Sequence, residues 1–351
     1  MPESHSEDAT IVAPPPPGET SGAGPGGRQK DSRPGMLRSA ADPRWFGVYA
    51  LIVLVVFFSI RFNITFFSLA NFQAILSNEA VGIILALALL IPLVVGQYDL
   101  SFASTLTLSL ITVTGLFQQH AAPVWLAVVG GVLVGAVVGA VNGFSIVYLR
   151  VNSLISTLAT GSIALGVAQW WTNGRIFSGG MPAGFSDFGN SFLWIIPMSA
   201  LIAGVLALVA WFVLERMSLG RYLYAIGDNP TAARTIGLPV GGLTFGAMVI
   251  GGCLAGLAGV VAAAKFGSGN PTIGPGYLLP AFSAVFLGST IFRLGRYNVV
   301  GTIVAVLLLA VLLSGLTQFG LPFYISPLLT GVALLGAVAV TLGRHLRKVN
   351  S

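Results

Sequence analysis

Charged residues are nearly absent from a stretch of about 300 residues, and this feature limits the possible folds more than any other. Only 14 of the 299 residues from Trp45 to Gly343 are Asp, Glu, Lys or Arg. Across all 351 residues the charged share is 8%, against about 25% in average soluble proteins. Hydrophobic residues reach 55%. A soluble domain could not bury so much apolar surface. The composition therefore predicts an all-α integral membrane protein and excludes both a disordered chain and, despite a net charge of +6, a nucleic-acid-binding protein.

The two ends of the chain differ from this body. Residues 1–44 hold 11 of the 28 charged residues and eight of the 19 prolines, and residues 344–351 add three basic residues. Such polar, proline-rich sequence cannot bury enough apolar surface to offset the entropy lost on ordering. We therefore expect three parts: a disordered tail over residues 1–44, a transmembrane domain over residues 45–343 and a basic tail over residues 344–351.

Apolar segments of about 20 residues can each cross a membrane as a helix. Ten such segments are separated by charges, Pro/Gly clusters and polar runs, near residues 45–60, 80–96, 101–117, 124–147, 154–171, 192–214, 243–264, 279–292, 298–317 and 324–342. The sequence predicts a polytopic bundle of about ten transmembrane helices, with eight to eleven possible. The second and third segments could be one interrupted helix, and the short eighth segment could be partly re-entrant.

The distribution of positive charge predicts the orientation of the spans. Lys and Arg are enriched in loops on the cytoplasmic side. When the ten spans alternate and the N-terminus is inside, 14 of the 17 Lys and Arg residues lie inside and only Arg61, Arg175 and Lys265 lie outside. We therefore expect both termini to be cytoplasmic.

Several kinds of chemistry are excluded or disfavoured by residue counts. The single cysteine, Cys253, rules out an internal disulfide and multi-cysteine metal sites. The three histidines, His5, His120 and His345, lie in the N-terminal tail, in a short connection and near the C-terminus. No Gly-x-x-x-x-Gly-Lys-Ser/Thr loop is present. We expect a protein that is not an enzyme, with no catalytic residues, no metal and no cofactor of its own.

Glycines at a spacing of four residues predict closely packed helices. Small residues recur at Gly131, Gly135, Gly139 and Gly143, and again at Gly252 and Gly256. Without side chains there, neighbouring backbones can approach closely. Packing within the bundle is the first interpretation, and a homodimer contact or a moving boundary between helices is the alternative.

The longest cytoplasmic connection, residues 215–242, contains the signals of a short helix. Asn229 suits an N-cap, Pro230 the first helical position and Gly237 the left-handed stop, which together predict a helix from Pro230 to Ile236. A helix this short needs partner or tertiary contacts to persist. Docking onto a cytoplasmic protein and an ordinary connecting loop both remain open on these residues alone. We call residues 215–242 the coupling segment.

This segment resembles the permease subunits of ribose/xylose-type ABC sugar importers, whose pattern is close to Gly-Arg-x-x-Tyr-Ala-Ile-Gly-x-Asn-x-x-Ala-Ala-Arg-x-x-Gly. Thr231 departs from the wider superfamily, which has Glu at that place. The resemblance implies that a separate ATPase subunit docks here, on Arg221, Tyr224, Asp228, Asn229, Ala232, Ala233, Arg234 and Gly237.

The resemblance covers most of residues 70–342. Asp99-Leu100-Ser101 is similar to a turn of the family, and Asp99 and Ser101 are expected to shape that turn. After Tyr277 the family usually continues with acidic residues, where this chain has Leu278 and Pro280. As a family member the chain would serve an ATP-driven, binding-protein-dependent importer of a small neutral sugar, as a homodimer in a prokaryotic cytoplasmic membrane. ATP-Mg would then bind the partner ATPase, and an extracytoplasmic sugar-binding protein would deliver the sugar.

A path for a neutral sugar needs hydrogen-bonding groups more than ions. Polar residues within or near the predicted spans supply the candidates, although each could instead form a helix–helix hydrogen bond. They are Asn142, Ser145, Gln169, Ser283 and Asn298.

An ion-coupled secondary transporter is the alternative function. Such a transporter normally needs ionisable residues inside the membrane, and Asp99, between the second and third predicted spans, is the only candidate in the body of the chain. Asp99 could equally cap the helix that follows it by accepting hydrogen bonds from amides near Ser101 and Phe102.

Overall fold

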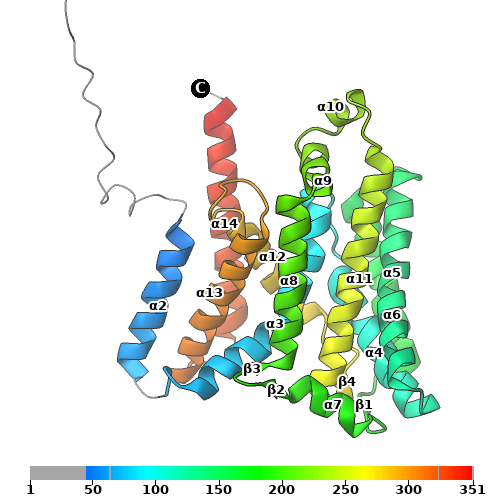
Figure 1. The fold of residues 1–351 in the computed structure, drawn as a ribbon, viewed down its shortest axis with the longest axis vertical. Helices are drawn as coiled ribbons and strands as arrows, with labels where there is room; N and C mark the ends of the chain where they lie inside the picture. Colours follow the sequence, from blue (N-terminus) through cyan, green and yellow to red (C-terminus); the bar gives the residue numbers. More distant parts are fainter. Residues whose placement is uncertain (1–44, 63–64, 323, 350–351) are drawn as a thin grey trace, which may run out of the picture. The chain divides into compact units, whose positions relative to one another are not determined.

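A computed structural model describes the backbone of residues 45–62, 65–322 and 324–349, and side chains as far as residue 339. The predicted tail over residues 1–44 lies outside the described residues. The described chain is almost entirely helical (Figure 1). Its longer helices are α2 (Phe46–Phe62), α3 (Leu69–Val94), α4 (Phe102–His120), α5 (Val124–Val147), α6 (Ser153–Thr172), α8 (Met198–Arg216), α11 (Val240–Phe266), α12 (Pro275–Gly288), α13 (Val299–Gln318) and α14 (Ile325–Val349).

Each of the ten predicted apolar segments coincides with one of these helices. Among the described residues, five helices are long and apolar enough to cross a membrane by length and composition: α3, α5, α8, α11 and α13. α2, α12 and the Ile325–Ala339 part of α14 are shorter apolar helices. The fold is that of a polytopic helical membrane protein, and the count of ten spans stays a prediction.

Short elements gather at the two ends of the bundle (Figure 1). At one end lie α7 (Ala183–Asn190) and four two-residue strands, β1 (Phe177–Ser178), β2 (Phe192–Leu193), β3 (Ile196–Pro197) and β4 (Ser268–Gly269). β1 pairs antiparallel with β4, and β2 pairs antiparallel with β3. At the opposite end lie α9 (Ser218–Asp228) and α10 (Pro230–Thr235), together with the beginning of α2 and the end of α14.

The core forms around α3 and α11. The second half of α3, from Ala80 to Val94, is buried on all sides, and α3 packs against α8, α11, α12 and α13. In contrast, α5 and α8 leave large apolar side chains exposed along one face, such as Val137 and Leu208. Apolar side chains on a membrane helix can face lipid tails at no cost, so both faces fit a membrane environment.

The periodic glycines lie where α5 and α11 touch. A Cβ atom built on Gly135 would collide with the carbonyl of Gly252, and one built on Gly139 would collide with the carbonyl of Met248. Gly256 in turn faces Gly131. Glycine allows the two backbones to meet without side chains between them. The prediction of close packing within the bundle is confirmed.

The predicted interruption after the second apolar segment is also confirmed. α3 ends at Val94, and α4 begins only at Phe102. Gly96 turns the chain with φ +78°. A difference concerns the other end of α3, which begins at Leu69 rather than near residue 80 and so includes Glu79. The expectation that Asp99 is the only candidate for an ionisable residue at membrane depth is therefore wrong, because Glu79 lies within α3, which is a candidate span.

Candidate functional site

The turn between α3 and α4 is held by the carboxylate of Asp99. Its Oδ1 accepts hydrogen bonds from the backbone N–H of Ser101 at 2.8 Å and from the Ser101 hydroxyl at 2.6 Å. Asp99 is almost completely buried. The predicted hydrogen bond from the Ser101 amide is confirmed, but the N-cap residue of α4 is Ser101 rather than Asp99, so Asp99 shapes the turn that precedes the helix. A carboxylate that accepts local N–H and O–H groups offsets part of the cost of its burial.

This turn is tied to two neighbouring helices. The amide Nδ2 of Asn142, on α5, donates to the Ser101 hydroxyl at 2.7 Å, and Asn142 accepts in turn from Thr160 on α6. The backbone N–H of Leu100 donates to Thr157 on α6 at 3.1 Å. One continuous set of hydrogen bonds thus joins the α3–α4 turn to α5 and α6, so these elements are positioned together.

The coupling segment contains the short helix that the sequence predicts. α10 begins at Pro230, and the side chain of Asn229 accepts from the backbone N–H groups of Thr231 and Ala232 at 3.1 and 3.0 Å. Gly237 follows with φ +84°. The preceding helix α9 was not predicted. Its apolar residues Leu219, Leu223 and Ile226 point toward the bundle at helical spacing, a pattern that would have revealed it.

The predicted coupling residues divide between a buried and an exposed set. Tyr224 and Ala233 are buried, with Ala233 only 2% exposed. The others are exposed or, for Gly237, lie at the exposed turn: Arg221, Asp228, Asn229, Ala232, Arg234 and Gly237. Ile236 follows α10 directly, and its large apolar side chain is 74% exposed. The sequence alone did not single it out as a docking residue. α10 and the residue that follows it thus expose Ala232, Arg234 and Ile236, two apolar side chains and a basic one. They lie at one end of the bundle, where α10 is (Figure 1).

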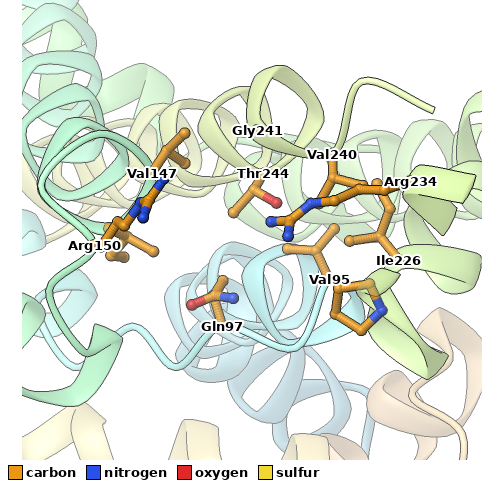
Figure 2. A pocket seen from close by; sticks show the side chains of 11 residues that line it. Val95, Gln97, Val147, Arg150, Ile226, Arg234, Val240, Gly241 and Thr244 are labelled. Atoms are coloured by element: carbon orange, nitrogen blue, oxygen red, sulfur yellow. The ribbon is translucent and has the colours of Figure 1, made fainter. Parts of the chain in front are cut away.

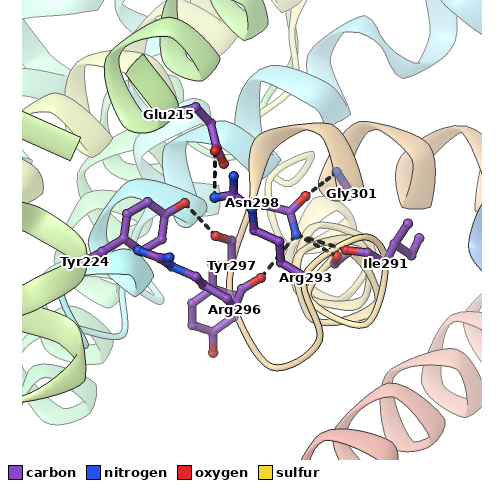
Figure 3. A network of polar contacts seen from close by, with 9 residues as sticks. Glu215, Tyr224, Ile291, Arg293, Arg296, Tyr297, Asn298 and Gly301 are labelled. Atoms are coloured by element: carbon purple, nitrogen blue, oxygen red, sulfur yellow. Dashed lines mark hydrogen bonds and ion pairs between the residues drawn. The ribbon is translucent and has the colours of Figure 1, made fainter. Parts of the chain in front are cut away.

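Polar contacts attach the coupling segment to the loop between α12 and α13 (Figure 3). Glu215, at the end of α8, forms an ion pair with Arg293 at 2.7 Å. The hydroxyl of Tyr224, on α9, donates to the carbonyl of Tyr297 at 2.7 Å, and the guanidinium of Arg296 lies over the Tyr224 ring. Burial, followed by the negative charge of Glu215, raises the pKa of Tyr224 to about 12, so its hydroxyl stays a donor at neutral pH.

Asn298 fixes the same loop from within. Its Nδ2 donates to the carbonyls of Gly288, Ile291 and Arg296 at 3.1–3.2 Å, and its Oδ1 accepts from the backbone N–H of Gly301 at 2.6 Å. Asn298 is therefore the N-cap of α13 and also closes the loop that carries Arg293 and Arg296 (Figure 3).

A cavity of about 560 Å³ lies beside the coupling segment. Arg150, after α5, and Arg234, on α10, lie on opposite sides of it, with Gln97 and Thr244 between them (Figure 2). Neither arginine forms an ion pair with a described residue. The cavity lies between Pro230 and Arg234 of α10 and the ends of α5 and α11.

The five predicted path residues are not brought together. Asn142 belongs to the buried network of the α3–α4 turn, and Asn298 to the α12–α13 loop. Ser145 is half-buried and donates to the carbonyl of Val141, whereas Ser283 is buried and donates to the carbonyl of Thr330. Gln169 is exposed near the end of α6. Hydrogen bonds between the described residues do not join any two of the five.

Among the described residues, no group of three or more His, Cys, Asp or Glu side chains could hold a metal ion.

A polytopic helical bundle with a protruding pair of short helices is the architecture of a membrane permease component. The chain belongs to the family described as permease components of branched-chain amino acid transport systems, which it matches over residues 71–338. It is similar to the Ribose import permease protein RbsC of Escherichia coli (strain K12), with 32% identity over 83% of this chain and 91% of that protein. It is also similar to the Autoinducer 2 import system permease protein LsrD of Salmonella paratyphi A, with 33% identity over 84% of this chain and 92% of that protein. No solved structure matches. The predicted membership of a permease family is confirmed.

Proposed function

We propose that the chain is the membrane-spanning permease subunit of an ATP-driven, binding-protein-dependent importer of a small neutral sugar. The exposed face of α10 carries the proposal, because a helix of six residues outside the bundle has no packing role on that face. Similarity to a ribose import permease and an autoinducer 2 import permease supports the substrate class.

The remaining parts of the importer follow from this role. The chain itself catalyses no reaction, ATP-Mg binds to a separate ATPase subunit, and an extracytoplasmic binding protein delivers the sugar. Two copies of the chain form the path, with ten spans each and both termini in the cytoplasm. The beginning of α2 and the end of α14 lie at the same end of the bundle as α10, which supports this orientation (Figure 1).

A docked ATPase would act on the bundle through two contacts of α9. Tyr224 of α9 contacts the α12–α13 loop, which Glu215 at the end of α8 also contacts. At the C-terminal end of α9, Gly227 lies so close to the carbonyl of Val94 that a Cβ atom there would collide with it, which connects α9 to the α3–α4 turn. A movement of α10 can thus be transmitted through α9 to the α12–α13 loop and to the α3–α4 turn.

The test is co-purification of the chain with the ATPase subunit of the importer, combined with sugar uptake. Ile236→Asp and Arg234→Glu change exposed side chains, so they should abolish both ATPase binding and uptake while leaving the fold intact. Ala232→Trp should do the same, whereas Ala233→Trp would test only folding, because Ala233 is buried. Arg175→Glu, an exposed charge change outside the coupling segment, is the control. ATPase binding that survives all three exposed changes would refute the docking assignment.

A further inference from the structure

A second, smaller cavity lies within the helix bundle and shares no lining residue with the cavity beside the coupling segment. Its volume is about 220 Å³. It is lined by residues of α3, α12, α13 and α14, and its polar lining consists of Asn78, Glu79, Tyr277 and Thr330. None of these residues belongs to the predicted path or to the coupling segment.

Glu79 brings a carboxylate into this cavity. Its side chain is half-buried and lies along α3 over Gly82, where a built Cβ atom would be 3.2 Å from Oε2. Among the described residues, no N–H or O–H group donates a hydrogen bond to this carboxylate. A carboxylate in such a setting retains its full capacity to accept hydrogen bonds from a ligand.

Lys265, at the end of α11, carries a positive charge near Glu79 but donates its hydrogen bonds to other residues. Its ammonium group donates to the carbonyl of Ser77 at 2.5 Å and to Oδ1 of Asn78 at 3.0 Å. The ammonium group also interacts electrostatically with the Glu79 carboxylate. The nearby positive charge makes the cavity a poor site for a cation, and it leaves the amide N–H₂ of Asn78 free to donate to a ligand.

Tyr277 contributes a ring and a hydroxyl to the lining of the cavity. It lies in the first turn of α12 and within electrostatic range of Glu79. Leu278 and Pro280, which follow it closely, supply no acidic group. The carboxylate near Tyr277 comes from Glu79 on α3.

We propose that this cavity is a binding site for the hydroxyl groups of one neutral monosaccharide. The carboxylate accepts from two adjacent hydroxyls, Asn78 donates to a ring or hydroxyl oxygen, and the Tyr277 ring covers the apolar face of the sugar. The volume is below the 300–1,000 Å³ that is usual for drug-sized ligands, so only a small molecule fits. This site rests on the proposed function, to which it adds the residues that select the substrate.

The direct test is binding of sugars to the full-length protein in lipid nanodiscs, measured by saturation-transfer difference NMR. D-ribose, D-xylose and D-galactose are the probes, and L-leucine is the zwitterionic comparison. At least one sugar should bind, and Glu79→Gln should weaken it by about tenfold or more, since charge-assisted hydrogen bonds are lost while the shape is kept. Tyr277→Leu should weaken the same sugar. Asp187→Asn, which removes an exposed carboxylate from α7, should leave binding unchanged.

The outcomes separate this site from the proposed function. If no sugar binds, if Glu79→Gln binds as well as the wild type, or if L-leucine is the ligand that depends on Glu79, the proposed site is wrong. Co-purification of each variant with the ATPase serves as the folding check, because Glu79 is remote in sequence from the coupling segment. A wild-type protein that binds sugar through Glu79 but never binds an ATPase would keep the site and refute the importer.

Discussion

The guanidinium carbon of Arg296 lies 3.9 Å from the centre of the Tyr224 ring, whose hydroxyl donates to the carbonyl of the next residue, Tyr297. The guanidinium covers the face of the ring, and the carbonyl holds the hydroxyl at its end. Because Tyr224 is on α9 and the other two residues lie just before α13, a displacement of α9 must move the α12–α13 loop or break both contacts. The loop is stiffened by Asn298, so we expect it to move with α9.

Tyr224→Phe removes the hydroxyl and keeps the ring under Arg296. We expect a loss of about 1 kcal/mol in the free energy of unfolding, since the carbonyl of Tyr297 loses its buried donor. Tyr224→Leu should cost more because it also removes the cation–π contact. The raised pKa means that the contribution of the hydroxyl is complete below pH 10 and is lost only as the pH rises through about 12.

Denaturation of the purified protein in detergent measures these differences. Tyr222→Phe is the matched control, because Tyr222 is on the same helix and is exposed. An equal loss of stability in Tyr222→Phe would contradict the role given to the Tyr224 hydroxyl.

The ion pair between Glu215 and Arg293 gives a second, independent test of the same connection. Its side chains are 11% and 50% exposed, so Arg293→Ala leaves a mostly buried carboxylate without its partner. We expect a loss of about 1 kcal/mol for this single change and a reduced rate of uptake. The exchanged pair Glu215→Arg with Arg293→Glu should recover part of both losses. The single variants Glu215→Arg and Arg293→Glu are measured separately as well. If the loss of the double variant equals the sum of their two losses, the pair does not couple α8 to the loop.

Much of the fold can be predicted from sequence because the membrane imposes one pattern. Apolar segments without charges must become helices, and each predicted segment corresponds to a helix. The short helix α10 was predicted because its capping residues Asn229, Pro230 and Gly237 act locally. Local rules of this kind need no knowledge of the neighbours.

The parts that were missed depend on residues distant in the sequence. The beginning of α3 contains Ser77, Asn78 and Glu79, whose polarity argues against a membrane helix. Lys265 binds two of these residues from 187 and 188 positions away, and no local pattern reveals that contact. The connection of Glu215 to Arg293 is of the same kind. Sequence identifies the residues that can form such contacts but does not pair them.

The glycine contact between α5 and α11 predicts a large effect from a very small change. Gly135→Ala adds one methyl group that collides with the backbone of Gly252, and a backbone cannot move aside as a side chain can. We expect a loss of about 3 kcal/mol or a failure to fold, which fluorescence-detected size-exclusion chromatography after heating would show. Gly166→Ala on α6, where nothing lies within 4 Å of the added methyl, should be neutral or stabilise by up to about 1 kcal/mol. Equal behaviour of the two variants would contradict the close packing.

Variants of Asp99 distinguish a role in shaping the α3–α4 turn from a role in ion transport. Asp99→Asn keeps an oxygen that accepts from the backbone N–H and the hydroxyl of Ser101, but it removes the charge. Asp99→Ala removes the acceptor as well, and this leaves the Ser101 amide without its partner and disturbs the contact to Asn142. If Asp99 only shapes the turn, Asp99→Asn retains most of the uptake, while Asp99→Ala loses uptake together with about 1–3 kcal/mol of stability. If ion coupling operates through this carboxylate, Asp99→Asn abolishes uptake at unchanged stability, and collapse of the proton gradient at constant ATP does the same to the wild type. Uptake and thermal denaturation measured on both variants therefore decide between an ATP-driven importer and an ion-driven transporter at this residue.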